Sequence, residues 1–282
     1  MIFEDKRYGE ERALYGISNA KVIRCSFDGD EDGESALKEC RKIEVEDCFF
    51  NLRYPLWHVE DAEITDSEMT EKCRAALWYD ERVSIKETKL HGIKALRECR
   101  SVNLAECDID SEEFGWRCND LKIRDCTLNS QYPFFECRGM DVERLDMKGK
   151  YSFQYIENSI FRDCVFNTKD AFWHAKNVTV YDSVINGEYL AWYSENLRLV
   201  RCKISGTQPL CYCKGLVLED CEMEGTDLSF ERSEVFADVR GSILSVKNPI
   251  SGYIRADSIG ETILNDGFEM DSKCKIEINC QI

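Results

Sequence analysis

Residues 119–137, NDLKIRDCTLNSQYPFFEC, are one copy of a pattern that recurs along most of the chain. Residues 100–118 read RSVNLAECDIDSEEFGWRC, and residues 195–213 read ENLRLVRCKISGTQPLCYC. Each copy has two apolar residues spaced two apart, a cysteine, another apolar residue, a polar loop and a segment that ends in cysteine. Self-similarity of this kind predicts a solenoid, in which each repeat packs only on its neighbours.

The central cysteine of each copy gives the register of the repeat. Between Thr88 and Cys221 this position recurs at seven consecutive steps of equal length. A fixed period of about 19 residues is typical of a solenoid. The members of this first column are Cys25, Cys48, Ser67, Thr88, Cys107, Cys126, Leu145, Cys164, Ser183, Cys202 and Cys221. A second column ends the aromatic segment and contains Cys40, Cys99, Cys118, Cys137 and Cys213.

Apolar residues alternate with polar ones before and after the first column, as in strands that are buried on one face. The alternation breaks at the column, which indicates a bend between two strands, and the aromatic segment supplies a third. Three short strands per turn, stacked at about 4.8 Å, predict an all-β, single-stranded, right-handed parallel β-helix of about 13 rungs. We assign residues 1–18 to an N-terminal cap and residues 19–282 to a single β-helix domain, with irregular last rungs from about residue 235.

The composition excludes several classes of protein. The chain has 282 residues and a formal net charge of −17, which argues against binding of nucleic acid through its phosphates. No apolar run approaches the roughly 20 residues of a membrane span, and the N-terminal segment carries charges where an export signal needs an apolar core. We therefore expect a cytoplasmic protein that binds neither nucleic acid nor membranes. The sequence does not decide its oligomeric state.

Sixteen cysteines in a chain without an export signal do not predict disulfides. Most of them fall in the two columns and no CxxC motif occurs, so we interpret them as buried thiols and expect no metal and no cofactor. Residues 28–33 followed by Glu39 satisfy the EF-hand calcium-loop pattern. The segment before them, KVIRCSF, reads as a strand where an EF-hand has a helix, so we interpret this stretch as an acidic loop.

Several strings of the sequence resemble those of a known family. They are GESALKE, NLRYPLWH, RAALWYD, GIKALREC, KGKYSFQY, KDAFWH and GTQPLCYC. They resemble an uncharacterised bacterial family that is known only as a domain of unknown function and is sometimes labelled a hydrogenase. The resemblance covers almost the whole chain and implies a right-handed β-helix of the pectate-lyase-like class. It implies no catalytic residues, because none are established, and the metal motifs that a hydrogenase needs are missing here.

All five tryptophans precede the second column by two positions. One position later lies a column of Tyr, His, Glu and Arg. Because adjacent residues of a strand face opposite sides, this polar column should face solvent and the tryptophans should face the core. The alternative is that the tryptophans form an exposed platform for sugar rings.

The polar column and the loop before it are the predicted ligand face. Tyr and His combine an apolar body with a polar tip, which suits polyhydroxylated ligands. The candidate ligand-binding residues are Tyr54, His58, Tyr79, Lys94, Glu98, Arg117, Glu136, Tyr155, Tyr193 and Tyr212. The alternative is stacking between rungs together with a surface ion ladder of Glu98, Arg117 and Glu136, which stabilises little.

Whether the chain is an enzyme stays open at this point. Glu98 and Glu136 have Arg117 between them, and a carboxylate beside a cation has a lowered pKa and is a poor general acid. His174, with Asp170 four residues earlier, is the better catalytic candidate, as a general base.

The leading interpretation is a β-helix protein that binds, and in one version processes, a carbohydrate or another small polar ligand along the third-strand face. The alternative is a non-catalytic acidic rod that binds a protein partner or serves as a scaffold. The mixture of His, Arg and Tyr with Glu in the outward column favours a polar ligand.

Overall fold

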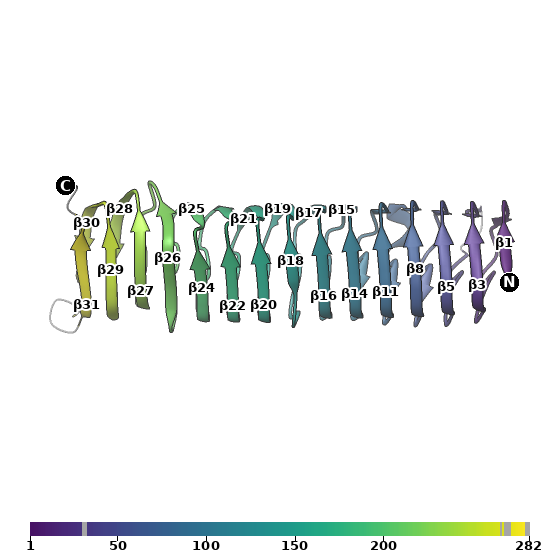
Figure 1. The fold of residues 1–282 in the computed structure, drawn as a ribbon, viewed down its shortest axis with the longest axis horizontal. Helices are drawn as coiled ribbons and strands as arrows, with labels where there is room; N and C mark the ends of the chain where they lie inside the picture. Colours follow the sequence, from purple (N-terminus) through teal and green to yellow (C-terminus); the bar gives the residue numbers. More distant parts are fainter. Residues whose placement is uncertain (30–32, 266, 268–271, 280–282) are drawn as a thin grey trace. The chain divides into compact units, whose positions relative to one another are not determined.

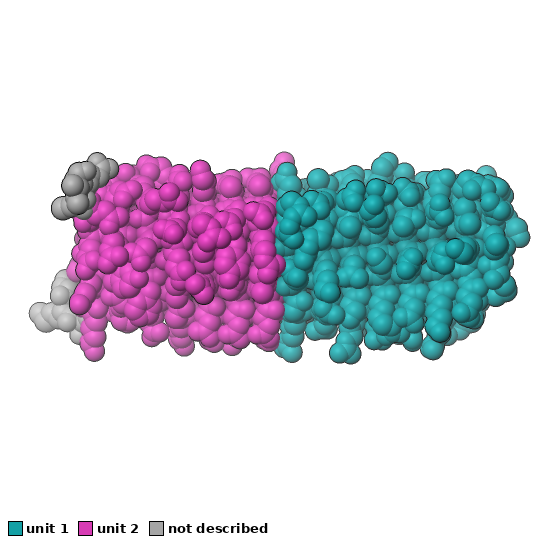
Figure 2. Space-filling model, in the orientation of Figure 1, with its two compact units in different colours: residues 1–146 teal, residues 147–282 magenta. Residues whose placement is uncertain are grey.

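The computed structural model describes residues 1–29, 33–265, 267 and 272–279. Within these residues the regular structure consists of β-strands and one 3-10 turn, η1 (Glu71–Cys73). None of the described residues form a helix long and apolar enough to span a membrane. The chain divides into two compact units, unit 1 with residues 1–146 and unit 2 with residues 147–282 (Figure 2).

Unit 1 is a stack of parallel strands whose long members lie side by side (Figure 1). Glu81 of one strand lies opposite Arg100 of the next, and Arg100 lies opposite Asn119, which is the step that the repeat predicts. The long strands are β1 (Ile2–Glu4), β3 (Ser18–Ile23), β5 (Arg41–Glu46), β8 (Glu60–Thr65), β11 (Glu81–Lys86), β14 (Arg100–Ala105), β16 (Asn119–Arg124) and β18 (Asp141–Glu143). The short second strands are β2 (Arg7–Tyr8), β4 (Ser26–Phe27), β6 (Phe49–Phe50), β9 (Glu68–Met69), β12 (Lys89–Leu90), β15 (Asp108–Asp110) and β17 (Thr127–Ser130).

Unit 2 repeats this arrangement, with Glu157 opposite Lys176 and Lys176 opposite Glu195. Its long strands are β20 (Glu157–Arg162), β22 (Lys176–Tyr181), β24 (Glu195–Val200), β26 (Leu216–Met223), β27 (Glu234–Arg240), β29 (Ser251–Ala256) and β31 (Lys273–Ile278). The other strands are β19 (Asp146–Lys150), which begins at the boundary, β21 (Val165–Lys169), β23 (Val184–Asn186), β25 (Lys203–Ser205), β28 (Ser242–Lys247) and β30 (Ser258–Ile263). A register shift in the pairing of β26 with β27 starts the irregular last rungs.

Each unit is therefore a parallel β-helix, as the repeat predicts, and within each the chain winds in the right-handed sense (Figure 1). The segment expected to be a cap, residues 1–18, contains strands β1 and β2. Ile2 of β1 lies opposite Lys21, and Arg7 of β2 lies opposite Ser26. This segment thus adds strands to the stack at the first rung.

The first column lies buried at the bend between the long strand and the second strand. The residue before each column member has a positive φ, which turns the chain. The N–H group of Cys48 donates to Ser67 Oγ on the next rung (3.1 Å), and Ser67 Oγ donates to the carbonyl of Thr65 (2.8 Å). Cys107 N donates in the same way to Cys126 Sγ (3.4 Å). Cys, Ser and Thr suit this column because each has a short side chain that can accept one hydrogen bond and donate another, and Leu145 is the exception that does neither.

The described cysteines are free thiols, and all but Cys274 are buried. Burial raises the pKa of the Cys40 thiol to about 11 and that of Cys73 to about 12. Such thiols keep their proton at neutral pH and can act as hydrogen-bond donors. The cysteines are thus part of the hydrogen-bonded core, in agreement with their interpretation as structural thiols.

Candidate functional site

The third segment of each rung carries the candidate site, and its backbone differs between the units. In unit 1 it forms the two-residue strands β7 (Leu56–Trp57), β10 (Leu77–Trp78) and β13 (Leu96–Arg97), and on a later rung it is a turn through the left-handed residues Phe134 and Glu136. In unit 2 it is a turn with two left-handed residues on each rung, such as Phe172 (φ 59°) and His174 (φ 55°). Phe172 N–H donates to Ser152 O on one side and His174 N–H donates to Trp192 O on the other, both at 2.9 Å.

The strict alternation expected of a strand does not hold in this segment, because left-handed residues change the direction of the side chains that follow. The core position is taken by the residue before each tryptophan: Leu77 and Phe172 are buried. The tryptophans are half-buried. They are therefore neither core residues nor fully exposed platforms.

The tryptophans stack on one another from rung to rung. The rings of Trp173 and Trp192 lie 5.3 Å apart at 5°, and those of Trp57 and Trp78 lie 5.5 Å apart at 11°. Trp173 Nε1 donates to Tyr189 O at 2.6 Å. Stacking and hydrogen bonding both fix Trp173 within the protein surface, whereas the indole N–H groups of Trp57 and Trp78 are buried without a partner among the described residues.

Beside the tryptophans, unit 2 carries a row of four stacked rings that we call the ring row: Tyr155, His174, Tyr193 and Tyr212. The centroid distances along the row are 4.8, 5.1 and 4.8 Å, and the interplanar angles are 7°, 9° and 14°. Tyr155 is 46% exposed and Tyr193 is 43% exposed. Because the rings cover one another's faces, the row presents ring edges to solvent, with their hydroxyl groups and imidazole nitrogens.

Three of the four rings have polar groups without a hydrogen-bond partner in the described part of the chain. In the described part of the chain, no hydrogen bond uses the hydroxyl groups of Tyr193 or Tyr212 or the ring nitrogens of His174. Burial is the main cause that raises the pKa of Tyr212, so its hydroxyl keeps its proton at neutral pH. The ring row thus offers unused hydrogen-bonding groups on a surface that stacking holds in place.

Asp170, the predicted partner of His174, is buried in the loop before the row. Burial raises the pKa of its carboxyl group above the ordinary value, against the opposing effect of Lys169. Among the described residues, no hydrogen bond or ion pair joins Asp170 to His174. The structure does not assemble them as a pair, and their catalytic role stays a prediction.

The equivalent row of unit 1 combines aromatic and charged residues. His58 stacks on Tyr79 at 5.1 Å and 14°. A hydrogen bond to Glu98 raises the pKa of the Tyr79 hydroxyl. On the following rungs, Arg117 Nε donates to Glu136 Oε2 at 2.7 Å. In this row the polar groups bind one another.

The two remaining candidates of unit 1 lie in the loop before the row. Tyr54 contacts Trp57 and Trp78, each at 6.2 Å between centroids. Lys94 Nζ lies 3.4 Å from Glu113 Oε2. Both side chains are therefore engaged with other residues of unit 1.

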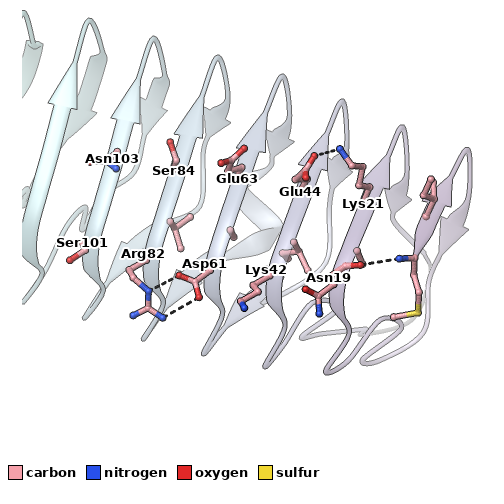
Figure 3. A pocket seen from close by; sticks show the side chains of 16 residues that line it. Asn19, Lys21, Lys42, Glu44, Asp61, Glu63, Arg82, Ser84, Ser101 and Asn103 are labelled. Atoms are coloured by element: carbon pink, nitrogen blue, oxygen red, sulfur yellow. Dashed lines mark hydrogen bonds and ion pairs between the residues drawn. The ribbon is translucent and has the colours of Figure 1, made fainter.

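Sequence reasoning missed a shallow groove of about 750 Å³ on the outer face of the long strands of unit 1 (Figure 3). Two rows of side chains border it: Asn19, Lys42, Asp61, Arg82 and Ser101 in one, and Lys21, Glu44, Glu63, Ser84 and Asn103 in the other. Arg82 Nε donates to Asp61 Oδ1 at 2.6 Å, and Lys21 pairs with Glu44. The repeat predicts that these positions are polar, but polar residues are expected on the solvent face of any exposed strand, so the pattern does not indicate a groove.

Metal binding finds no further support in this structure. Within the described ranges, no group of three His, Cys, Asp or Glu residues is placed to hold a metal ion. Residues 30–32 of the calcium-loop match lie outside the described residues.

The chain belongs to a family described as "Protein of unknown function (DUF3737)", whose model matches residues 1–277. The expectation of an uncharacterised family is thereby confirmed. No curated protein matches the chain significantly. The solved structure of the surface adhesin PfbA of Streptococcus pneumoniae is 6% identical, with 86% of this chain and 82% of that chain covered and a TM-score of 0.42. The A-module of the mannuronan C-5 epimerase AlgE4 of Azotobacter vinelandii is 9% identical, with 98% and 85% covered and a TM-score of 0.29. These likenesses carry no argument about the function of this chain.

Proposed function

We propose that this member of the DUF3737 family binds an extended polar ligand of carbohydrate type along the ring row of unit 2. The observation that carries the proposal is the row itself: four stacked rings, of which His174, Tyr193 and Tyr212 have polar groups without a hydrogen-bond partner among the described residues. A surface that presents unused hydrogen-bonding groups in a fixed order suits a ligand with many hydroxyl groups.

The stacking also supports the proposal on energetic grounds. Binding costs free energy when mobile side chains become ordered, about 0.5–1.5 kcal/mol for each one. The rings of His174 and Tyr193 are already held by a neighbour on each side. Little of this ordering cost remains when a ligand arrives, so weak hydrogen bonds can add up to useful affinity.

The proposal concerns binding and assigns no reaction. A hydrolase of the usual kind needs two carboxyl groups on either side of the bond that is cleaved. The ring row itself contains no carboxylate, and the nearby Asp170 is buried. His174 is accordingly assigned a role in contacting the ligand.

A thermal-shift screen with linear oligosaccharides tests the proposal. Wild-type protein should show an increased melting temperature with at least one of them. Tyr193→Ala should abolish this shift, because it removes a ring and its hydroxyl from the row. Tyr79→Ala, the matched change in unit 1, should preserve it. A panel without any shift, or a shift that Tyr193→Ala leaves intact, would refute the proposal.

A further inference from the structure

We infer that the ligand is a neutral, linear glycan that the ring edges bind through hydrogen bonds, rung by rung, without stacking of sugar rings on aromatic faces. This inference rests on the proposed function and specifies its ligand. Three features of unit 2 carry it: the covered ring faces, the spacing of the edges, and the pairing of the charges around the row.

The ring faces are not available to a ligand. His174 has Tyr155 at 4.8 Å on one face and Tyr193 at 5.1 Å on the other, both nearly parallel. Tyr193 is covered in the same way by His174 and Tyr212. A cation bound by an aromatic ring must sit over its face, and a sugar that stacks needs the same place. The two central rings therefore leave no free face for an ammonium group or a stacked sugar, and they offer hydrogen bonding at their edges as the mode of recognition.

The edges recur once per rung, and this spacing selects the kind of ligand. Neighbouring strands are about 4.8 Å apart, so the four rings span about 14 Å over three steps. A ligand that contacts them all must present hydrogen-bonding groups repeatedly over this length. An extended peptide rises by about 3.3 Å per residue and falls out of step with the rungs. A hydroxylated polymer, with several hydroxyl groups on each unit, has a partner within reach at every rung.

The charges around the row indicate that the ligand is neutral. Lys169 pairs with Glu188 at 3.0 Å, and Lys176 pairs with Glu195 at 3.4 Å. Asp170 is buried, and burial raises its pKa. At the far end of the row, the negative charge of Glu231 acts on Tyr212 more strongly than the positive charge of Arg232 does. The groups around the row therefore offer little positive charge to bind an acidic polymer. The net charge of −17 adds long-range repulsion against polyuronates.

The test compares removal of hydroxyl groups with removal of rings. The double variant Tyr193→Phe/Tyr212→Phe keeps every ring of the row and deletes two hydroxyl groups. Isothermal titration would use neutral cello-, manno- and xylo-oligosaccharides, and oligogalacturonate as the acidic counterpart. We expect wild-type protein to bind a neutral oligosaccharide and not oligogalacturonate. The double variant should lose about tenfold in affinity, which is about 1.4 kcal/mol, because it deletes two hydroxyl groups that each form a hydrogen bond with the ligand.

The possible results separate the inference from the proposed function. If the double variant binds as tightly as wild-type protein while Tyr193→Ala does not bind, the ligand uses the rings themselves; edge recognition is then wrong and the proposed function stands. Preference for oligogalacturonate would overturn the neutral ligand. Absence of binding to every oligosaccharide would overturn the proposed function and the inference with it. Unchanged unfolding of the double variant in denaturant confirms that the fold is intact in each case.

Discussion

The third segments of unit 1 and unit 2 occupy the same repeat position but use their polar groups differently. In unit 1, Tyr79 bonds to Glu98 and Arg117 bonds to Glu136. In unit 2, the hydroxyl of Tyr193 has no partner among the described residues. The difference lies in what stands on the neighbouring rung. When the neighbouring rung carries a charged residue, that residue can form a hydrogen bond with the polar group of the aromatic side chain. When the neighbouring rung carries another aromatic residue, the two rings stack and leave their polar edges open.

The core beneath the two segments differs as well. Leu77 occupies the inner position in unit 1, where the segment forms a short strand. Phe172 occupies it in unit 2, where it stacks on Phe153 at 4.7 Å. The left-handed turn does not require an inner ring, because Ala191 and Leu210 occupy the same position on other rungs of unit 2. The ring row thus stands on phenylalanines beneath Tyr155 and His174 and on the smaller Ala191 and Leu210 beneath its other two members.

The largest effect in this comparison is expected from removal of Phe172, the buried ring beneath His174. Phe172→Ala should lower the free energy of unfolding by about 3–5 kcal/mol, because a buried phenylalanine leaves a large cavity. It should also abolish ligand binding by the ring row. Leu77→Ala should destabilise unit 1 by about 2–5 kcal/mol and leave the ring row intact. Denaturant unfolding measures both; a loss below about 1 kcal/mol for Phe172→Ala would contradict the assignment of this core.

The second test concerns Asp80, which stands in the second column of unit 1. Its Oδ1 accepts from Val59 N at 2.8 Å, its Oδ2 is buried without a partner, and burial raises its pKa well above the ordinary 3.8. The folded carboxyl keeps its proton at pH values where the unfolded one has lost it. Stability is therefore lost as pH rises above 3.8 towards the folded pKa.

Asp80→Asn cannot ionise, so it should remove this pH dependence. At neutral pH we expect it to be more stable than wild-type protein by about 1–3 kcal/mol, because the wild-type carboxyl group must take up a proton on folding and the amide need not. Below the ordinary pKa of the carboxyl group the two proteins should be alike. Denaturant unfolding across the acidic to neutral range measures the difference. Parallel pH profiles for the two proteins would show that Asp80 is not the cause.

A smaller effect on stability is expected from changes to the cysteines of the second column. Cys118 Sγ accepts a hydrogen bond from Cys99 N at 3.4 Å. Cys118→Ser retains an acceptor and a donor and should change stability little. Cys118→Ala should cost about 1 kcal/mol more than the serine variant, because Cys99 N–H loses its partner. Equal stability of the two variants would show that the column depends on side-chain volume alone.

The smallest effects are expected for Tyr79 of unit 1 and Tyr193 of unit 2, the two tyrosines whose hydroxyl groups differ in hydrogen bonding. Glu98→Gln should bring the pKa of Tyr79 down towards its ordinary value, because the hydrogen bond to the carboxylate is the main cause of its elevation. Ultraviolet difference absorbance during alkaline titration follows this change, with Tyr79→Phe identifying the signal. Tyr193→Phe should leave the unfolding midpoint unchanged, since its hydroxyl bonds to nothing in the described part of the protein. A clear loss of stability in Tyr193→Phe would remove the contrast between the units.

The sequence predicts the register of this fold closely, because a fixed period and two columns leave few alternatives. It also predicts that Tyr155, His174, Tyr193 and Tyr212 share one line. It does not predict how the tryptophans lie. Residues with side chains rarely adopt a positive φ, and nothing in the local sequence announces the left-handed conformations around Trp173.

Two other features stay hidden for related reasons. Asp80 is buried, although carboxylates are rarely found in a core. The groove of unit 1 is formed by polar residues at every rung, and such residues are expected on any exposed sheet face. In both cases the position in the repeat is evident from the sequence, whereas the environment depends on neighbouring rungs.

Because the columns are aligned, the chain can be shortened or lengthened by whole rungs without loss of register. Removal of residues 176–194 would place Glu195 after Ala175 and return every later column residue to an equivalent partner. Deletion of a single residue at a bend would displace the column side chain there from the N–H group it satisfies. Where a step is longer than the regular period, as between Glu60 and Glu81, the extra length lies in a loop that contains η1. Insertions are thus tolerated between strands and forbidden at the bends.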